Sequence, residues 1–393
     1  MAHIHCILLS QQHVPNLLGI HALNPDRIVM LESDAMKRAS AAEGLLAALE
    51  LGGLSYRGRC DVINLSGVDD ITSLQAALRQ AYAIGPQAQW SCNITGGTKI
   101  MSIAAYEYFK ALGASLYYVE SSKPDDLIPI HNAIQLKCNH RLGLAEFCAG
   151  YGFDSAKSDK DSAIAENSAS DWWECSRLLA QHATTQSVLC ISDRDRWEEG
   201  RKKGLELAAG ELRIMTDGLS QQCADRLKLT RQGESLIGKV NKCVFRFLSG
   251  EWLECFIWGL LQKHAVSLGL WDVRLGFKPQ KVGSKTDNDF DVAFMRDYAL
   301  CMVECKTGSQ EHDKNADILY KIDSVTRMFR ALHVWAFLAT TSDSVLDKQG
   351  VLKEGLRNRA ANLGCTIILR DAIRAMAANP GDLSCIKKAF KWQ

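Results

Sequence analysis

The sequence lacks several features that would place it in a specialised class of protein. The longest apolar run, around 252–261, is far shorter than the roughly 20 residues of a membrane-spanning helix. Residues 1–6 carry no positively charged leader or cleavage site, so we expect no signal peptide. Internal repeats and low-complexity tracts are absent as well. These absences favour a globular protein that neither enters a membrane nor is exported.

Cysteine and histidine occur without the spacings of metal sites. None of the 14 cysteines forms a Cys-x-x-Cys pair, and the ten histidines show no His-x-x-x-His or Cys/His pattern typical of zinc. The cysteines are scattered in apolar runs, which indicates reduced, buried thiols and a cytoplasmic location. A net charge of +1 excludes a uniformly basic surface. It leaves room for a local basic groove, for which 278–285 is a candidate.

Strand-like and helix-like segments alternate in the first third of the chain. With 393 residues, 47% apolar and 23% charged, we expect two or three globular domains. Alternation of strands and helices predicts a parallel α/β sheet with crossover connections. The predicted strands are 3–9, 26–32, 61–65, 89–94 and 115–119, and the predicted helices are 35–51, 71–84 and 99–112.

The remainder divides into a connector and a second α/β unit. The pattern weakens near 143–160, so we predict domains at 1–142, 143–246 and 247–393. Within the connector, 171–183 is predicted to be a helix, 187–192 a strand and 193–203 a solvated helical face. The stretch from 227 onward could form a small winged-helix-like unit. In the last part we predict a helix from Ser249 as N-cap to about 268, strands at 271–277, 333–340 and 366–369, and a helix at 316–332.

The strongest chemical signal is a predicted hairpin that carries Asp291 on one strand and Glu304-Cys305-Lys306 on the next. Strand side chains alternate between faces, so Glu304 and Lys306 point the same way and Cys305 points the other. Carboxylates beside a lysine form an oxygen-ligand site for a hard divalent cation, with an ammonium able to hold or activate water. On its own, such a triple is more often a solvated strand face, and an ion pair with Lys306 is the alternative role for Glu304.

A fourth residue strengthens this reading. Glu254 lies on a predicted helix that is otherwise almost wholly apolar, where a carboxylate is costly unless it is paired or bound to metal. An ion pair with Lys321 is the alternative role for Glu254, and Glu251 could replace it as the helical acid. The part played by Asp289 also stays open.

This arrangement resembles the PD-(D/E)xK superfamily of restriction-endonuclease-like nucleases over about 248–339. The resemblance implies that Glu254, Asp291 and Glu304 bind Mg²⁺ or Mn²⁺ together with the peptide oxygen of Cys305. It implies that Lys306 supports the attacking water. The residues at 319–324 fit one branch of the superfamily, whereas the proline that often precedes the first strand acid is absent before Asp291.

A second constellation, Asn93-Ile94-Thr95-Gly96-Gly97-Thr98-Lys99, joins a predicted strand to a helix. Its glycines permit close approach of a ligand, and the helix amides, hydroxyls and lysine suit a phosphate. The spacing is neither that of a Walker A loop nor that of a dinucleotide fingerprint. An ordinary capped turn explains the segment equally well.

With a Rossmann-like context over about 1–119, Thr95–Lys99 resembles the CARF domain, the CRISPR-associated Rossmann fold. The resemblance implies a homodimer that senses cyclic oligoadenylate, with Ser10, Gln11 and Gln12 of the first loop joining Asn93, Thr95, Gly96, Gly97, Thr98 and Lys99. Together the two resemblances imply a nuclease activated by a cyclic oligoadenylate, with cyclic tetra-adenylate as the expected ring, that cuts DNA, RNA or both in type III CRISPR defence. Two rivals are a non-catalytic nucleotide-sensing regulator that binds nucleic acid and an ATP-using ligase or NTPase.

Overall fold

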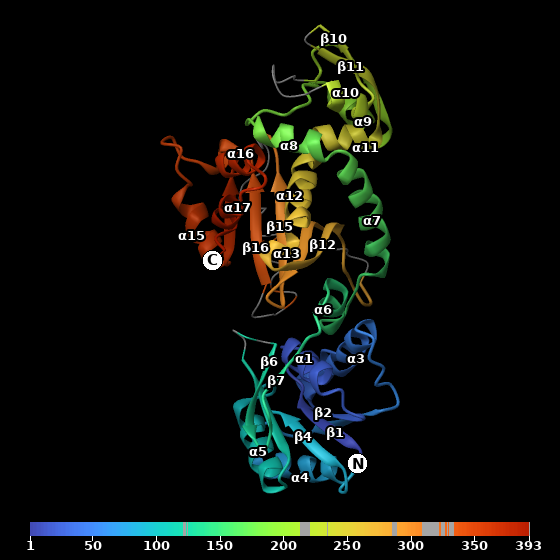
Figure 1. The fold of residues 1–393 in the computed structure, drawn as a ribbon, viewed down its shortest axis with the longest axis vertical. Helices are drawn as coiled ribbons and strands as arrows, with labels where there is room; N and C mark the ends of the chain where they lie inside the picture. The colour runs from blue at the N-terminus through green and yellow to red at the C-terminus, as the bar shows by residue number, and fades with distance from the viewer. Residues whose placement is uncertain are drawn as a thin grey trace.

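The computed structural model describes residues 1–120, 123, 125–212, 221–233, 235–284, 289–308, 322–323, 327, 329 and 334–392. Three parts follow one another along the longest axis (Figure 1). The blue and cyan N-terminal sheet lies at one end, the orange and red C-terminal sheet in the middle, and a small green and yellow module at the other end. No helix in the described part of the chain has the length and apolar character to span a bilayer.

The N-terminal domain is a seven-stranded sheet in the order β3-β2-β1-β4-β5-β6-β7. Its first five strands are parallel, as predicted, and β6 and β7 add an antiparallel edge. The elements are β1 (His3–Leu8), α1 (Val14–Leu23), β2 (Arg27–Ser33), α2 (Asp34–Arg38), α3 (Ala41–Leu51), β3 (Cys60–Leu65), α4 (Ile71–Tyr82), β4 (Gln89–Asn93), α5 (Lys99–Ala111), β5 (Ser115–Val119), β6 (Asp126–His131) and β7 (Leu136–Lys137).

Two apolar cores sandwich this sheet because consecutive strand residues face opposite sides. Cys6 and Leu8 of β1 pack with α4 and α5, whereas Ile7 and Leu9 pack with α1 and α3. Helix α1 was not predicted, because Pro15 and its polar neighbours resemble a loop. Proline is tolerated in a first helical turn, where its missing N–H has no partner to lose. The single helix predicted at 35–51 is two helices, since Ser40 adopts a left-handed backbone with φ 52°.

The C-terminal domain is a five-stranded mixed sheet in the order β12-β14-β15-β16-β17. One face packs against α12, α16 and α17, and the other against α6 and α15. The predicted strands in this part are confirmed. Of the helix predicted at 316–332, almost all lies outside the described residues. The elements are α12 (Trp252–Lys263), α13 (Ala265–Leu268), β12 (Leu270–Phe277), β13 (Gln280–Lys281), β14 (Phe290–Arg296), β15 (Ala299–Lys306), β16 (Val334–Thr340), η2 (Asp343–Val345), α15 (Glu354–Asn362), β17 (Cys365–Leu369), α16 (Arg370–Ala378) and α17 (Leu383–Phe390).

The segment between the two sheets does not form one separate body. α6 packs against α3 and also contributes Phe147 to the C-terminal core, and α8 packs beside α12. Beyond α8, the hairpin of β10 and β11 joins β9 in a three-stranded antiparallel sheet, an arrangement compatible with a winged-helix-like unit. The predicted strand at 187–192 is only an isolated bridge from Leu189 to Leu212. The elements are α6 (Leu144–Gly150), β8 (Phe153–Asp154), α7 (Ala156–Asp171), α8 (Trp173–Gln181), α9 (Arg194–Lys203), β9 (Gly204–Leu207), α10 (Gln221–Leu227), β10 (Thr230–Gln232), β11 (Ser235–Asn241), α11 (Lys242–Arg246) and η1 (Phe247–Glu251).

Candidate active site and ligand site

The predicted hairpin is formed by β14 and β15. Their antiparallel register pairs Val292 with Val303, and one further step sets Asp291 opposite Glu304. The Asp291 carboxylate accepts a hydrogen bond from the backbone N–H of Cys305 at 2.6 Å. Lys306 Nζ lies 2.6 Å from Glu304 Oε1, and the two side chains are 28% and 7% exposed. The structure therefore brings the two strand acids and the lysine together at one end of the hairpin.

Glu254 reaches this cluster from the first turn of α12. The preceding chain is already helical from Lys242, through α11 and the π-helical turn η1, so the prediction of Ser249 as N-cap is wrong. Its hydroxyl instead donates to the carbonyl of Arg246 at 2.9 Å. Gly250 bends the chain with φ 155°, and a Cβ there would lie 2.5 Å from Thr307 Oγ1. This close approach fixes the start of α12 against the end of β15.

The charges at the cluster interact strongly. Burial raises the pKa of Glu254 well above its usual range, and repulsion from Asp291 and Glu251 adds to this, while Lys306 opposes it. Burial alone would lower the pKa of the Lys306 ammonium, but the charges of Glu304 and Asp291 outweigh it and raise the net value. The carboxylates of the cluster outnumber its lysine, so the cluster carries an excess of negative charge. The all-oxygen donor set fits a hard divalent cation such as Mg²⁺ or Mn²⁺.

Cys305 and the two additional acids have other contacts. The Cys305 side chain is buried in the core on the opposite face of the sheet, and this burial raises the pKa of its thiol, so only its backbone faces the acids. Glu251 is paired with Arg246, and Asp289 with Lys278 at 2.9 Å. Lys321, the alternative partner of Glu254, lies outside the described residues, as do Leu319 and Tyr320. The predicted basic segment 278–285 is described up to residue 284 and includes the short strand β13.

At the N-terminal sheet, the two predicted ligand loops lie together at the carboxyl ends of β1 and β4. A Cβ at Gly96 would stand 2.1 Å from the carbonyl oxygen of Leu8 and 3.5 Å from Ser10 Oγ, so only glycine permits this packing. Gly97 has φ 73°, a conformation that also favours glycine. Thr98 caps α5 by accepting a hydrogen bond from the Met101 N–H at 3.2 Å. This arrangement leaves Lys99 exposed in the first turn of the helix.

Other predicted ligand residues hold the loops in shape. The buried Asn93 donates from Nδ2 to the Pro15 carbonyl and to Asn16 Oδ1, both at 3.1 Å. Its Oδ1 accepts from the N–H and hydroxyl of Thr95 at 3.0 and 2.6 Å. Ser10 Oγ contacts the backbone of Gln12. Gln11, Thr98 and Lys99 are exposed at the surface of the two loops, while Ser10, Gln12, Thr95 and Gly97 are partly exposed.

Two family models match the chain. The Card1 CARF domain matches residues 4–147, and the Card1-like endonuclease domain matches residues 241–368. The chain belongs to the Card1-like CARF nucleases. This confirms the resemblance to CRISPR-associated nucleases that join a CARF domain to a restriction-endonuclease-like domain. In a search of curated proteins, none matches the chain.

Solved structures share the fold of this CARF nuclease from end to end. Can2 from Sulfobacillus thermosulfidooxidans, in complex with cyclic tetra-adenylate, is 17% identical with a TM-score of 0.68, covering 99% of each chain. Protein VC1899 from Vibrio cholerae is 18% identical with a TM-score of 0.70, covering 99% of this chain and 98% of its own. A type III CRISPR defence DNA nuclease activated by cyclic oligoadenylate is 14% identical with a TM-score of 0.51, covering 92% and 52%.

Two residues of this CARF nuclease that shape its sites were missed from the sequence. Asn16 is buried in α1, where its Nδ2 donates to the Leu8 carbonyl at 3.0 Å while its Oδ1 accepts from Asn93. Thr307 abuts Gly250 beside the acidic cluster. An asparagine after a proline reads as a loop residue, and nothing marks a threonine after Glu-x-Lys, so neither carried a signal of its own.

Proposed function

We propose that this protein is a metal-dependent endonuclease activated by cyclic oligoadenylate in CRISPR defence. The observation that carries the proposal is the convergence of Glu254, Asp291, Glu304 and Lys306 from a helix and two strands. Membership of the CARF nucleases supports both parts of the proposal, because one family model is that of a CARF domain and the other that of an endonuclease domain. The complex of Can2 with cyclic tetra-adenylate supports this ring as the activator to be tested first.

At the acidic cluster, Glu254, Asp291, Glu304 and the peptide oxygen of Cys305 would hold Mg²⁺ or Mn²⁺. The bound ion supplies positive charge that polarises the scissile phosphate and eases loss of a proton from water. The neighbouring carboxylates keep Lys306 charged, so its ammonium donates hydrogen bonds to the attacking water or to a phosphate oxygen. The hydrogen bond from the Cys305 N–H orients Asp291 within the cluster.

At the other site, exposed donors of the two loops would bind the phosphates and riboses of the activator. Lys99 supplies charge, and the first turn of α5 supplies free backbone amides. Gln11 and Thr98 stand beside it, with Ser10, Gln12, Thr95, Gly96 and Gly97 beneath them. Asn93 shapes the loop through its internal hydrogen bonds. Tight packing of Gly96 on Leu8 makes the two loops one surface for the ligand.

A homodimer follows from the symmetry of the ligand. A cyclic molecule with an even number of repeats can lie on a twofold axis and present the same groups to the same loop of each subunit. Ile103 lies one helical turn after Lys99 and is 53% exposed, which supports a contact on this side of α5. The ligand then acts by its differential affinity for the active and resting dimers. DNA, RNA or both are the substrates, in the cytoplasm.

The decisive assay measures cleavage of plasmid DNA and of labelled single-stranded DNA and RNA. Purified protein is incubated with Mn²⁺ or EDTA, and with or without cyclic tri-, tetra- or hexa-adenylate. We expect cleavage only when both metal and one ring are present, and loss of cleavage in Glu304→Ala and Lys306→Ala. The exposed Lys348→Ala is the matched control and should cut normally.

Each rival function has its own outcome in this assay. Ligand-dependent binding of nucleic acid without any cleavage would favour a non-catalytic regulator and refute the endonuclease. ATP-dependent turnover that ignores cyclic oligoadenylate would favour a ligase or NTPase. Equal cleavage by Glu304→Ala and wild type would refute the assignment of the site while leaving the activity in place.

A further inference from the structure

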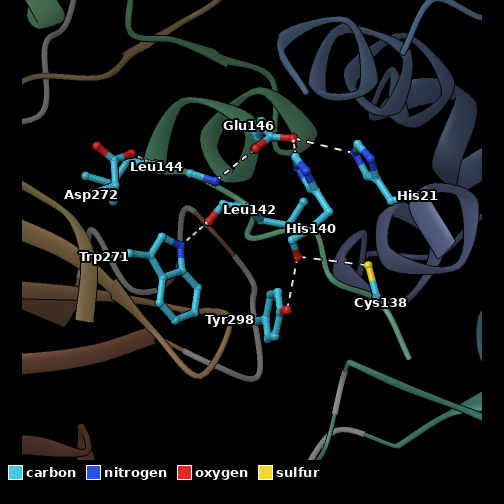
Figure 2. A network of polar contacts seen from close by, with 10 residues as sticks. His21, Cys138, His140, Leu142, Leu144, Glu146, Trp271, Asp272 and Tyr298 are labelled. Atoms are coloured by element: carbon cyan, nitrogen blue, oxygen red, sulfur yellow. Dashed lines mark hydrogen bonds and ion pairs between the residues drawn. The ribbon is translucent and has the colours of Figure 1, made fainter. Parts of the chain in front are cut away.

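A second group of possible metal ligands lies far from the acidic cluster, at the junction between the two domains. His21 in the last turn of α1, His140 in the connection between β7 and α6, and Glu146 in α6 place their ligand atoms within 4.8 Å of one another (Figure 2). Their separation in the sequence explains why no spacing pattern reveals them. No lysine or arginine in the described part of the chain pairs with the buried Glu146.

The three side chains converge on one carboxylate oxygen, and the rings of His21 and His140 lie face to face with centroids 3.7 Å apart and 9° between their planes. His140 Nε2 lies 2.8 Å and His21 Nε2 lies 3.6 Å from the same oxygen, Glu146 Oε1. The His21 side chain is only 5% exposed, yet its Nε2 makes no hydrogen bond although it faces the cluster. The other carboxylate oxygen, Oε2, accepts from the Gly143 N–H at 2.9 Å, which fixes the carboxylate and leaves Oε1 as a single ligand.

Gly52, the residue after α3, lies directly against two of the three side chains. A Cβ at Gly52 would stand 2.2 Å from Glu146 Oε1 and 2.8 Å from the His21 ring, so a larger residue there would displace both side chains. Tetrahedral bonds of about 2.0–2.1 Å require ligand atoms about 3.3 Å apart. The two N–O distances need adjustments of about half an ångström to meet this requirement. The stacked rings of His21 and His140 must also turn apart, so that both Nε2 lone pairs point at one ion. Two imidazoles and one carboxylate are a donor set for zinc and not for Mg²⁺.

We propose that His21, His140 and Glu146 bind one Zn²⁺ ion that joins the sensor domain to the segment leading into the nuclease domain. That segment is already held to the nuclease side by three hydrogen bonds, all drawn in Figure 2. Tyr298 donates to the His140 carbonyl at 3.0 Å, and Trp271 Nε1 donates to the Leu142 carbonyl at 2.8 Å. The Leu144 N–H donates to Asp272 Oδ2 at 2.7 Å.

The zinc therefore ties the end of α1, the helix that follows the first ligand loop, to residues of β12 and the β14–β15 turn. With three protein ligands, the fourth position is left to water on the side of His140, whose side chain is 28% exposed. This site is distinct from the acidic cluster in ligand chemistry as well as in place, so its occupancy can be measured separately from nuclease activity.

The test uses the full-length chain with Glu304→Ala, which removes one ligand of the nuclease site. Equilibrium dialysis against Zn²⁺ with metal analysis should find one zinc per chain. Glu146→Gln keeps the size of the side chain and an acceptor for the Gly143 N–H, and it should weaken binding at least 100-fold, as should His140→Ala. His131→Ala, a histidine of β6 outside the cluster, should bind like the parent.

Two further readouts guard against zinc bound elsewhere. Cobalt(II) should give intense visible bands of low-coordinate nitrogen ligation that disappear in Glu146→Gln, and no thiolate charge-transfer band. Zinc at 100 times its Kd should shift the unfolding equilibrium of the parent about 100-fold and that of Glu146→Gln far less. Equal zinc binding in parent and Glu146→Gln, no bound zinc in the parent, or a thiolate band would each overturn the proposal.

Discussion

Replacing Lys306 with methionine should separate the structural and chemical roles of the lysine. Methionine is unbranched and one atom shorter than lysine, and it removes the positive charge that lies 2.6 Å from Glu304, whose side chain is 7% exposed. Breaking one side of a buried ion pair costs about 3–5 kcal/mol. Because Lys306 is 28% exposed, solvent offsets part of this, and we expect a loss of about 2–3 kcal/mol.

Urea unfolding in EDTA at neutral pH measures this loss without bound metal. The double variant Glu304→Gln/Lys306→Met removes both charges and should recover most of the stability while remaining inactive. Lys306→Arg should stay folded, yet cut more slowly because the planar guanidinium places its N–H donors differently from the compact ammonium. If Lys306→Met unfolds at the same urea concentration as wild type, the stability of the folded protein does not depend on the lysine beside Glu304. That result would refute the argument that the cluster is short of positive charge.

Three other predictions concern separate parts of the molecule. Gly250→Ala should lower the free energy of unfolding by about 2–3 kcal/mol and slow cleavage, because its Cβ meets Thr307 in a strained backbone; normal stability would contradict this. Burial lowers the pKa of His13 to about 4 from 6.5, so the unfolded chain takes up the proton first as the pH falls. The free energy of unfolding should therefore drop by about 3 kcal/mol from pH 6.5 to 4, and His13→Gln should flatten this loss. Lys99→Ala should raise the activator concentration for half-maximal cleavage at least about tenfold without changing the maximal rate, and an unchanged dose response would exclude a phosphate contact.

The regular parts of the fold could be predicted because local patterns decide them. Strands such as Ser115–Val119 are short apolar runs between helices of clear period, and their bounds agree with the structure. Helix α1 could not be predicted, because its stability comes from packing on the sheet and not from its own sequence. The start of α12 was predicted wrongly for a related reason. In the sequence alone, a glycine bend inside a continuous helical run looks like the cap of a new helix.

The residues of the candidate sites likewise differ in how far the sequence predicts their positions. Asp291, Glu304 and Lys306 are near neighbours across one hairpin, so strand alternation sufficed to place them on a common face. The contact of Gly96 with Leu8 joins residues some ninety positions apart and follows only from the parallel order of β1 and β4. The cluster of His21, His140 and Glu146 depends on the packing of α1 against the segment that leads into α6, and no spacing pattern in the sequence indicates it.

The hydrogen bond from the Cys305 N–H to Asp291 has a consequence for how homologous sequences vary. The middle position of Glu-x-Lys is usually written as free, but here it must supply an N–H, so proline is excluded. Its side chain is 6% exposed in an apolar core, so large or charged residues are excluded as well. We therefore expect small apolar residues at this position in relatives that keep the acid opposite, and a drift toward polar residues or proline to mark copies that have stopped cutting.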